Sequence, residues 1–368
     1  VGLGQGELTF WEAVQAIENG TDLADVPGLV VQRDGEPHYT PHRPVVGWDK
    51  LAPTPWHLLE YERYVERQND YGRAKVRHKY PEPWGLPPGV QYRGFSHYSS
   101  FGCPEPCTFC CSPMGTGRRW KAVGGGQLAE ELLELHERFR FNVVRFQDAN
   151  FGVSEKRSNQ FCQGLIDAGS PFWWSGTYEI ETIARYSDEA LDLMAASKLH
   201  MAALGAEAGS QEQQDRIKKA IQIPDIELAL AKLNARRIQS GTSWIIGYPG
   251  ESRESMMATL ERAAEMKHKF PRSASDIFPF RPIPGTEDFD TAVRLGYQAP
   301  RTLDQWGSVL EYKLEVDDIR LPLDVFQAWR RYGITSTFYD GLVHEGSGAV
   351  RGLMRSISGW RLKNMNYR

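Results

Sequence analysis

The sequence predicts an α/β protein whose centre is a parallel sheet of six strands, curled into a partial (β/α)6 barrel. From Tyr92 to Phe280, apolar runs of strand length alternate with longer segments whose apolar residues recur at helical spacing. The connections between them are short, which favours parallel strands with helices packed outside the sheet. Because crossovers between parallel strands are right-handed, such a sheet curls toward a barrel.

The predicted strands and helices follow one another in a regular order after the first 84 residues. The strands are expected at Tyr92 to Ser99, Asn142 to Gln147, Phe172 to Thr177, His200 to Ala206, Thr242 to Gly247 and Ala274 to Phe280. The helices are expected at Leu128 to Phe139, Glu155 to Ala168, Asp188 to Ser197, Gln211 to Lys219, Pro224 to Arg237 and Arg253 to Lys269. Two helices precede the fifth strand, and one precedes each of the others after the first.

Residues 1–84 precede this alternation and have a different pattern. A helical segment ends at Gly20, and two short extended runs then flank an Asp34-Gly35 turn of hairpin type. A proline-rich connector from Leu51 to Trp56 leads into an aromatic stretch that reaches Trp84. This pattern predicts a helix, a small hairpin and a linker.

Residues 301–368 follow the sheet and have one clear helical stretch, from Leu323 to Phe338. The remainder is polar and interrupted by glycines, so we expect a small helical extension that caps the barrel or its substrate side. Its basic residues (Arg351, Arg355, Arg361, Lys363 and Arg368) are interpreted as a solvated face.

Composition excludes several classes of protein. The 368 residues carry 43 Lys and Arg against 47 Asp and Glu, a formal charge of −4 that predicts neither nucleic-acid nor membrane-surface binding. The sequence has no apolar run that could span a bilayer and no signal peptide. Because the chain begins at Val1, within an apparent structural element, we expect a longer protein. The few cysteines predict a reducing cytoplasm.

Four of the five cysteines lie in the segment that follows the first predicted strand. Cys103, Cys107 and Cys110 stand in a C-x3-C-x2-C spacing, and Cys111 follows directly. Thiolates hold iron–sulfur clusters, and clusters that only transfer electrons normally have four of them. Three protein ligands on a [4Fe–4S] cluster would leave one iron open, as a catalytic zinc site keeps one position free.

Other interpretations of these cysteines explain fewer of them. A structural zinc site needs a second pair of ligands at a distance, but only Cys162 lies outside the segment, in a predicted helix where it is a core residue. A disulfide framework is not expected in a chain of this length with so few cysteines. A thioredoxin-like pair of Cys107 and Cys110 would leave Cys103 and Cys111 without a role.

The segment, with Phe109 before its last cysteine, closely resembles the signature of the radical S-adenosylmethionine (SAM) superfamily. The resemblance implies a [4Fe–4S] cluster on Cys103, Cys107 and Cys110, with SAM chelated to the open iron beside Phe109. It implies that reductive cleavage of SAM gives a 5′-deoxyadenosyl radical, which removes hydrogen from a small-molecule substrate. It further implies an external electron donor such as flavodoxin or ferredoxin.

The same resemblance implies SAM contacts at the C-terminal ends of strands, where β/α barrels place their working residues. Asp148, after the second strand, would bind the ammonium group of SAM. Glu207 and Ser210 lie in the segment GAEAGS after the fourth strand, where Glu207 would bind the ribose or the amino group. Gly247 and Pro249, in GYPGE after the fifth strand, would let the backbone approach adenine.

Structural roles stay open for several of these positions. Asp148 stands where helix N-caps and loop carboxylates are common, and the glycines after the fifth strand also suit an ordinary turn. Glu179 and Glu181 follow the third strand, where related enzymes tend to carry a basic residue and an aspartate. A SAM contact from the third strand is therefore not assigned.

The order of the segments DANF, GAEAGS, GYPGES and PIPGT is similar to that of cobalamin-dependent radical SAM enzymes of the class B methyltransferase type. This resemblance implies that residues 1–84 are the tail of a cobalamin-binding domain with its linker, 85–300 the radical SAM core and 301–368 an extension. It implies cobalamin as a third cofactor and C-methylation of a small molecule. The Asp-x-His-x-x-Gly loop of cobalamin-binding domains is absent and would lie before Val1.

Two alternatives stay open, and the second belongs to a different class of protein. A cobalamin-free radical SAM enzyme would be methylthiotransferase-like, or would catalyse a cyclisation or rearrangement. A non-catalytic iron–sulfur or zinc protein would bind metal without cleaving SAM, and a SAM-cleavage assay on anaerobic protein separates these possibilities.

Overall fold

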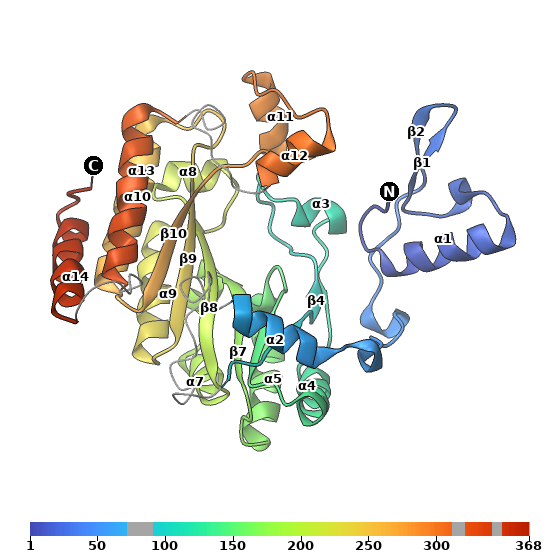
Figure 1. Cartoon of the computed structure of the whole chain (residues 1–368), viewed down its shortest axis with the longest axis horizontal. Helices are drawn as coiled ribbons and strands as arrows, with labels where there is room; N and C mark the ends of the chain where they lie inside the picture. The colour runs from blue at the N-terminus through green and yellow to red at the C-terminus, as the bar shows by residue number, and fades with distance from the viewer. Residues whose placement is uncertain (72–90, 311–320, 341–347, 368) are drawn as a thin grey trace.

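A parallel sheet of six strands forms the centre of the computed structural model, which describes residues 1–71, 91–310, 321–340 and 348–367. The strands are β3 (Gly94–His97), β6 (Val143–Phe146), β7 (Trp173–Glu179), β8 (Leu199–Glu207), β9 (Gln239–Ile246) and β10 (Ser273–Pro279). They lie in the order β10-β9-β8-β7-β6-β3, and every pair is parallel. The predicted α/β fold with its partial barrel is confirmed (Figure 1).

Helices cover the outer face of this sheet. They are α4 (Gly125–Phe139), α5 (Glu155–Asp167), α6 (Ile180–Arg185), α7 (Asp188–Ala196), α8 (Gln211–Arg216), α9 (Ile223–Ala235) and α10 (Arg253–Lys269). Side chains of Ser154, Ser187 and Ser252 cap the N-termini of α5, α7 and α10, since each accepts a backbone N–H three residues later. The short α6 directly after β7 was not predicted, because its apolar residues follow the strand without a break.

The core lies between the sheet and these helices. Trp174 on β7 and Trp244 on β9 are its largest fully buried side chains. The indole Nε1 of Trp174 donates to the Ser197 carbonyl oxygen at 3.0 Å, and that of Trp244 donates to Ser275 Oγ at 2.9 Å. A buried donor without a partner costs about 1–3 kcal/mol of folding free energy. These hydrogen bonds avoid that cost, so both indole rings can be buried in the apolar core.

Side chains protect both edges of the sheet. Along β10, the carbonyl oxygens of Ser273, Ser275 and Ile277 accept hydrogen bonds from Lys267 Nζ (2.8 Å), Tyr332 Oη (2.7 Å) and Trp329 Nε1 (2.9 Å). At β3, the side chain of Gln68 bonds both the carbonyl oxygen (2.9 Å) and the amide (3.0 Å) of Gly94. Exposed strand edges can pair with strands of other chains. Here these side chains already occupy backbone groups at the edges, which hinders such pairing.

The protecting residues come mainly from helices at opposite ends of the chain. Gln68 lies on α2 (Tyr61–Tyr71), while Trp329 and Tyr332 lie on α13 (Leu323–Tyr339), which packs against α10 and β10. The predicted helix from Leu323 to Phe338 is therefore confirmed. The other elements after the sheet are α11 (Glu287–Arg294), α12 (Leu303–Leu310) and α14 (Gly348–Lys363). The glycine-interrupted end thus forms a helix that was not predicted.

The N-terminal residues form a small unit beside the barrel (Figure 1). Its helix α1 (Glu7–Asn19) ends at Gly20, and strands β1 (Val30–Arg33) and β2 (Glu36–Tyr39) pair as the predicted hairpin. A separate small core of Ala16, Val26 and Leu29 holds it together. The predicted aromatic stretch to Trp84 lies partly outside the described residues.

Short elements connect this unit to the barrel and shape the barrel's mouth. Trp48 stacks on Phe101 with ring centroids 4.7 Å apart, which places the linker against β4 (Ser100–Phe101). β4 pairs antiparallel with β5 (Lys121–Ala122), and α3 (Ser112–Thr116) lies between them. Within the described residues, no helix is long and apolar enough to cross a membrane.

Candidate functional site

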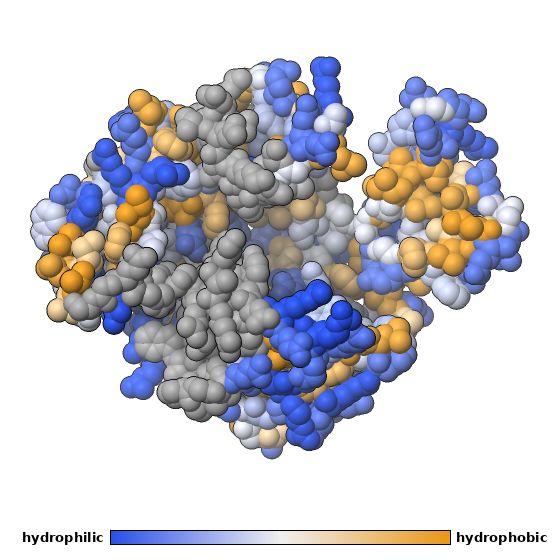
Figure 2. All heavy atoms as spheres, in the orientation of Figure 1, coloured by the Kyte–Doolittle hydropathy of each residue, from blue (hydrophilic) through white to orange (hydrophobic). Residues whose placement is uncertain are grey.

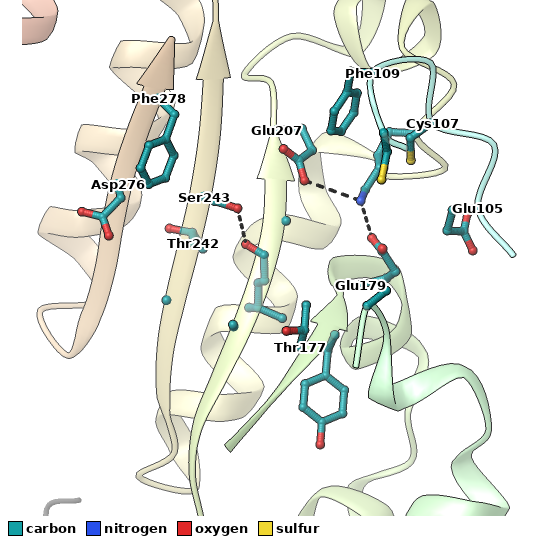
Figure 3. A pocket seen from close by; sticks show the side chains of 18 of the residues that line it. Glu105, Cys107, Phe109, Thr177, Glu179, Glu207, Thr242, Ser243, Asp276 and Phe278 are labelled. Atoms are coloured by element: carbon teal, nitrogen blue, oxygen red, sulfur yellow. Dashed lines mark hydrogen bonds and ion pairs between the residues drawn. The ribbon is translucent and has the colours of Figure 1, made fainter. Parts of the chain in front are cut away.

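A cavity of about 750 Å³ opens on the inner face of the sheet. Its walls come from β7, β8, β9 and β10, from the loop that carries the cysteines, and from Trp329 on α13. Figure 3 shows the cysteine loop facing the end of β8 across the upper part of this cavity. The volume is typical of sites for small molecules.

Three of the five cysteines line this cavity. Cys103, Cys107 and Cys110 are brought together there, as their spacing predicted. Cys111 is exposed and does not line the cavity, while Cys162 is fully buried within α5. All five cysteines are free thiols. Burial raises the pKa of Cys103 to about 11 and that of Cys107 to about 12, so a bound cation would be needed to hold them as thiolates.

Neighbouring elements fix the backbone of the cysteine loop. The amide of Thr108 donates to the Ile217 carbonyl oxygen at 3.1 Å, and its hydroxyl donates to Asp288 at 2.9 Å. Gly102 precedes the first cysteine with φ +81°, and a Cβ there would lie 2.0 Å from the Arg119 carbonyl oxygen. Only glycine fits this position, so the loop enters the cavity along one path.

The donor set fits an iron–sulfur cluster better than a single metal ion. In the described part of the chain, no three His, Cys, Asp or Glu side chains converge as ligands of one ion. A cluster of several irons takes each thiolate on a different iron, so it needs three thiols along one cavity wall. Cys103, Cys107 and Cys110 meet this requirement.

A buried lysine between two glutamates lies beside the cysteines. Lys219 Nζ is 2.5 Å from Glu179 Oε2 and 3.6 Å from Glu207 Oε1, and all three side chains are at most 10% exposed. Burial raises the pKa of Glu207 to about 7 against the opposing effect of Lys219. Burial also lowers the pKa of Lys219, but the charges of Glu179 and Glu207 outweigh it and raise that pKa above its usual range. Glu179 and Glu207 thus share the charge of Lys219 at the wall of the cavity, where a ligand can reach all three side chains.

Only one member of this trio was predicted as a site residue. Glu207 lies at the end of β8 with φ +60°, where the pairing with β9 shifts, and this turns its carboxylate into the cavity. Gly205 makes room for it, because a Cβ at Gly205 would lie 2.1 Å from Glu207 Oε1. Glu179 was left unassigned and Lys219 was missed. The only sequence signal for Lys219 is its place after a helix that follows the fourth strand.

Phe109 is the aromatic residue of the cysteine segment, and its predicted contact with the cofactor stays a prediction. It lines the cavity and meets Tyr248 edge to face, with ring centroids 5.6 Å apart. Tyr248 is buried directly after β9. Tyr248 thus supports the ring of Phe109 at the cavity wall that also contains Cys110.

Asp148 takes a different position from the one its proposed contact requires. Its carboxylate accepts hydrogen bonds from the Ser99 amide (2.7 Å), the Ser99 hydroxyl (2.6 Å) and the Ser100 hydroxyl (2.6 Å). It does not line the cavity, although the next residue, Ala149, does. Asp148 thus fixes the strand that leads into the cysteine loop. Its contact with SAM stays a prediction.

Ser210, Gly247 and Pro249 also lie outside the cavity lining. Ser210 caps α8 by accepting the Gln213 amide at 3.3 Å. Gly247 has φ +81° and donates its amide to Glu251 at 2.7 Å, in the turn that also contains Pro249. The role of Gly247 matches the alternative of an ordinary turn after the fifth strand, and the predicted SAM contacts of all three residues stay predictions.

A sequence profile distinguishes a radical SAM protein from the other kinds of metal-binding protein that the cysteines allow. The profile of the Radical SAM superfamily matches residues 98–263, from just before β4 into α10. The chain contains a radical SAM domain. This confirms the resemblance seen in the cysteine segment, and a radical SAM domain implies a [4Fe–4S] cluster and SAM.

Curated relatives of this radical SAM protein include enzymes named methyltransferases. An uncharacterized methyltransferase of Pyrococcus horikoshii is 25% identical over 291 residues, which are 79% of this chain and 57% of the relative. The cytidylyl-2-hydroxyethylphosphonate methyltransferase of Streptomyces wedmorensis is 24% identical over 327 residues, 81% of this chain and 57% of that protein. This radical SAM chain therefore spans little more than half the length of either.

Two solved radical SAM structures share the fold. The methyltransferase TsrM of Kitasatospora setae, solved with cobalamin and a [4Fe–4S] cluster, has a TM-score of 0.58 at 18% identity over 81% of this chain and 55% of its own. The enzyme OxsB, solved with aqua-cobalamin and SAM, has a TM-score of 0.65 at 15% identity over 99% of this chain and 56% of its own.

Proposed function

We propose that this chain is the catalytic core of a cobalamin-dependent radical SAM enzyme that methylates a carbon atom of a small molecule. The observation that carries the proposal is the extent of the fold likeness to OxsB, which covers 99% of this chain. That extent includes the N-terminal unit, which lies outside the matched domain at residues 98–263. The relatives named methyltransferases support the type of reaction.

The residues around the cavity have distinct roles in this proposal. Cys103, Cys107 and Cys110 hold the cluster, and Phe109 with Tyr248 keeps water away from it. When bound, the cluster supplies the electron that cleaves SAM into methionine and a carbon radical, and cobalamin supplies the methyl group.

The buried trio suits the charged groups of SAM. The positive charge of Lys219 would bind the carboxylate of SAM. Glu179 and Glu207 would accept hydrogen bonds from its ammonium group or its ribose hydroxyls. Binding would replace part of the internal pairing between Lys219 and the two acids. In the proposal, Lys219, Glu179 and Glu207 would hold these charged groups of SAM next to the cysteines.

The surface of the N-terminal unit supports a neighbouring domain. Phe10, Trp11 and Ile17 on α1 are 73%, 58% and 67% exposed. Figure 2 shows a broad apolar surface on this unit, at the right of the view. Contiguous apolar surface of this kind is typical of a face that another domain covers. In the proposal, a cobalamin-binding domain covers it.

Two measurements test the proposal in sequence. Anaerobic protein reconstituted with iron and sulfide is incubated with SAM and a low-potential reductant, and we expect 5′-deoxyadenosine to accumulate. The protein together with any residues that precede Val1 in its gene is then incubated with hydroxocobalamin, and we expect corrin absorbance to co-elute with it. We expect the present 368 residues alone to bind cobalamin weakly or not at all, since partial sites rarely offset the entropy cost of association.

Each measurement can fail separately. Failure to form 5′-deoxyadenosine would contradict the radical chemistry as a whole. SAM cleavage without cobalamin binding would contradict only the methyl transfer. The cobalamin-free alternative, a methylthiotransferase-like or cyclising enzyme, would then take its place.

A further inference from the structure

Three basic residues lie on the outer surface of the segment that carries the cysteines. Arg118, Arg119 and Lys121 come shortly after the last cysteine of that segment, and all three are exposed. Lys121 lies on β5, where it pairs with Phe101 on β4. Within the described residues, no ion pair neutralises Arg119 or Lys121. We call Arg118, Arg119 and Lys121 the basic patch.

The basic patch is held directly against the start of the cysteine loop. The carbonyl oxygen of Arg119 lies so close to Gly102 that an added Cβ there would be 2.0 Å from it. The side chain of Arg118 donates from Nε to the carbonyl oxygen of Pro104 at 3.0 Å. Cys103 stands between Gly102 and Pro104 in the sequence. The patch therefore contacts both chain neighbours of a proposed cluster ligand.

The site of the cluster also reaches the molecular surface beside this patch. Cys110 is half-buried, and Cys111, which directly follows it, is exposed. Helix α3 leads from Cys111 toward the patch and lies outside the sheet of the barrel in Figure 1. An electron carrier bound at the patch would therefore lie close to the cluster without entering the cavity.

The charge of this surface is opposite in sign to that of the whole chain. Within residues 98–124 the sequence has three basic residues and one acid, Glu105, and Glu105 lines the cavity. The formal charge of the whole chain is −4. A compact acidic protein would be attracted and oriented by the patch and repelled elsewhere. A long polyanion such as a nucleic acid would extend beyond the patch and meet that repulsion.

We propose that the basic patch is the docking surface for an acidic redox protein that delivers single electrons to the cluster. The proposal rests on the proposed function, because reductive cleavage of each SAM molecule takes one electron from the cluster. In each transfer the docked protein is oxidised by one electron and the cluster is reduced by one, and no bond or proton is exchanged. The patch thus determines the charge of the partner, and the cluster determines its chemistry.

Two reductants separate docking from the chemistry at the cluster. Anaerobic protein with its cluster, including any residues that precede Val1 in its gene, is incubated with SAM. The reductant is either dithionite or a limiting amount of an acidic flavodoxin, reduced beforehand and freed of excess reductant. With flavodoxin, Arg119→Glu combined with Lys121→Glu should slow formation of 5′-deoxyadenosine by roughly tenfold or more, because electrostatic steering raises association rates by roughly 10- to 1,000-fold. With dithionite, which needs no docking surface, the rate should stay unchanged.

A matched control carries the same change of charge at the opposite edge of the sheet. Arg138 and Arg237 are exposed, and each precedes the start of a strand, β6 or β9, away from the cysteine loop. Arg138→Glu combined with Arg237→Glu should leave the rates with both reductants unchanged. Salt should slow reduction of the unsubstituted protein by flavodoxin, since the screening length falls from about 30 Å at 0.01 M to about 10 Å at 0.1 M.

A binding measurement keeps this result apart from failure of the proposed function. Oxidised flavodoxin is titrated by calorimetry at low salt into the unsubstituted protein and both double variants. The variant of Arg119 and Lys121 should bind it about tenfold more weakly than the other two proteins, since two attractive charges become repulsive. If the unsubstituted protein cleaves no SAM with dithionite, the proposed function is contradicted, and this titration still decides the docking surface.

Two results would overturn the docking surface. One is equal binding of flavodoxin by all three proteins. The other is a rate of SAM cleavage in the variant of Arg119 and Lys121 that is undiminished with flavodoxin, or that falls equally with dithionite.

Discussion

Tyr332 on α13 donates a hydrogen bond of 2.7 Å to the carbonyl oxygen of Ser275 on β10. Tyr332 is only 2% exposed, so water cannot readily replace its hydroxyl. The bond ties a helix near the end of the chain to the edge strand that forms one wall of the cavity.

Loss of this hydroxyl should destabilise the protein. Tyr332→Phe keeps the ring but leaves the Ser275 carbonyl oxygen without its donor, which costs about 1–3 kcal/mol for a buried group. Urea denaturation should report a free energy of unfolding lower by this amount. Tyr39→Phe, at a residue 68% exposed, is the control and should change nothing measurable. Equal stability of the two variants would mean that the edge of β10 needs no donor.

The cysteines should fall into two groups by cluster content. Cys103→Ala, Cys107→Ala and Cys110→Ala should each abolish the cluster absorbance and SAM cleavage, because each removes a thiol from the cavity wall. Cys162→Ala, in the core of α5, should retain both. Iron and sulfide analysis with the visible spectrum makes the measurement. A full cluster in Cys107→Ala would contradict the assignment.

Glu207→Ala should weaken SAM binding while the cluster remains. Its carboxylate lies in the cavity beside Lys219, and loss of one polar contact to a buried ligand costs about 1–3 kcal/mol, or roughly 5- to 150-fold in affinity. Equilibrium dialysis with SAM measures the change. Glu212→Ala, on the exposed side of α8, is the control. Unchanged affinity in Glu207→Ala would leave Glu207 with a structural role alone.

Asp148→Asn tests which of two roles that residue has. The amide nitrogen cannot accept the bonds that Ser99 and Ser100 now donate, so we expect the free energy of unfolding to fall by about 1–3 kcal/mol. Thermal and urea unfolding measure this loss. A loss of SAM affinity at full stability would instead support the contact predicted from the sequence.

Acid should destabilise the protein partly through His200. This residue is 8% exposed on β8, and burial lowers its pKa to about 4 from an ordinary value near 6.5. The unfolded chain then binds a proton that the folded chain does not, so stability falls as the pH falls from 6.5 to 4. In this window His200→Gln should reduce the slope of unfolding free energy against pH by up to about 1.4 kcal/mol per unit. An unchanged slope would contradict the lowered pKa.

The barrel could be predicted from the sequence because most of its strands and helices have a local sequence signal of their own. All six strands were predicted within a few residues, since turn residues and switches in apolar spacing mark their ends. The cysteines were equally clear, because their chemistry depends on spacing along the chain. Helix α14 was missed, since glycines such as Gly352 and Gly359 disfavour a helix locally and its packing on α13 and α10 compensates for them.

Contacts between distant segments were not predictable in this way. Lys219 meets Glu179 across forty residues, and Asp148 meets Ser99 across a similar distance. A sequence pattern gives the place of each residue on its own element, but the register between strands decides which residues meet. The pairing of Gly241 with Ala203 and Ala274 is likewise visible only in the assembled sheet.

The two edge strands of the sheet, β3 and β10, receive their covering side chains at different times during synthesis. Gln68, which covers β3, leaves the ribosome 26 residues before Gly94, so its donor is ready when that strand appears. Tyr332 follows Ser275 by 57 residues, and at typical rates of translation that interval lasts roughly 3–11 s. For those seconds the edge of β10 has neither Tyr332 nor Trp329 to cover it. The nascent chain is therefore most open to aggregation on the side where α13 later packs.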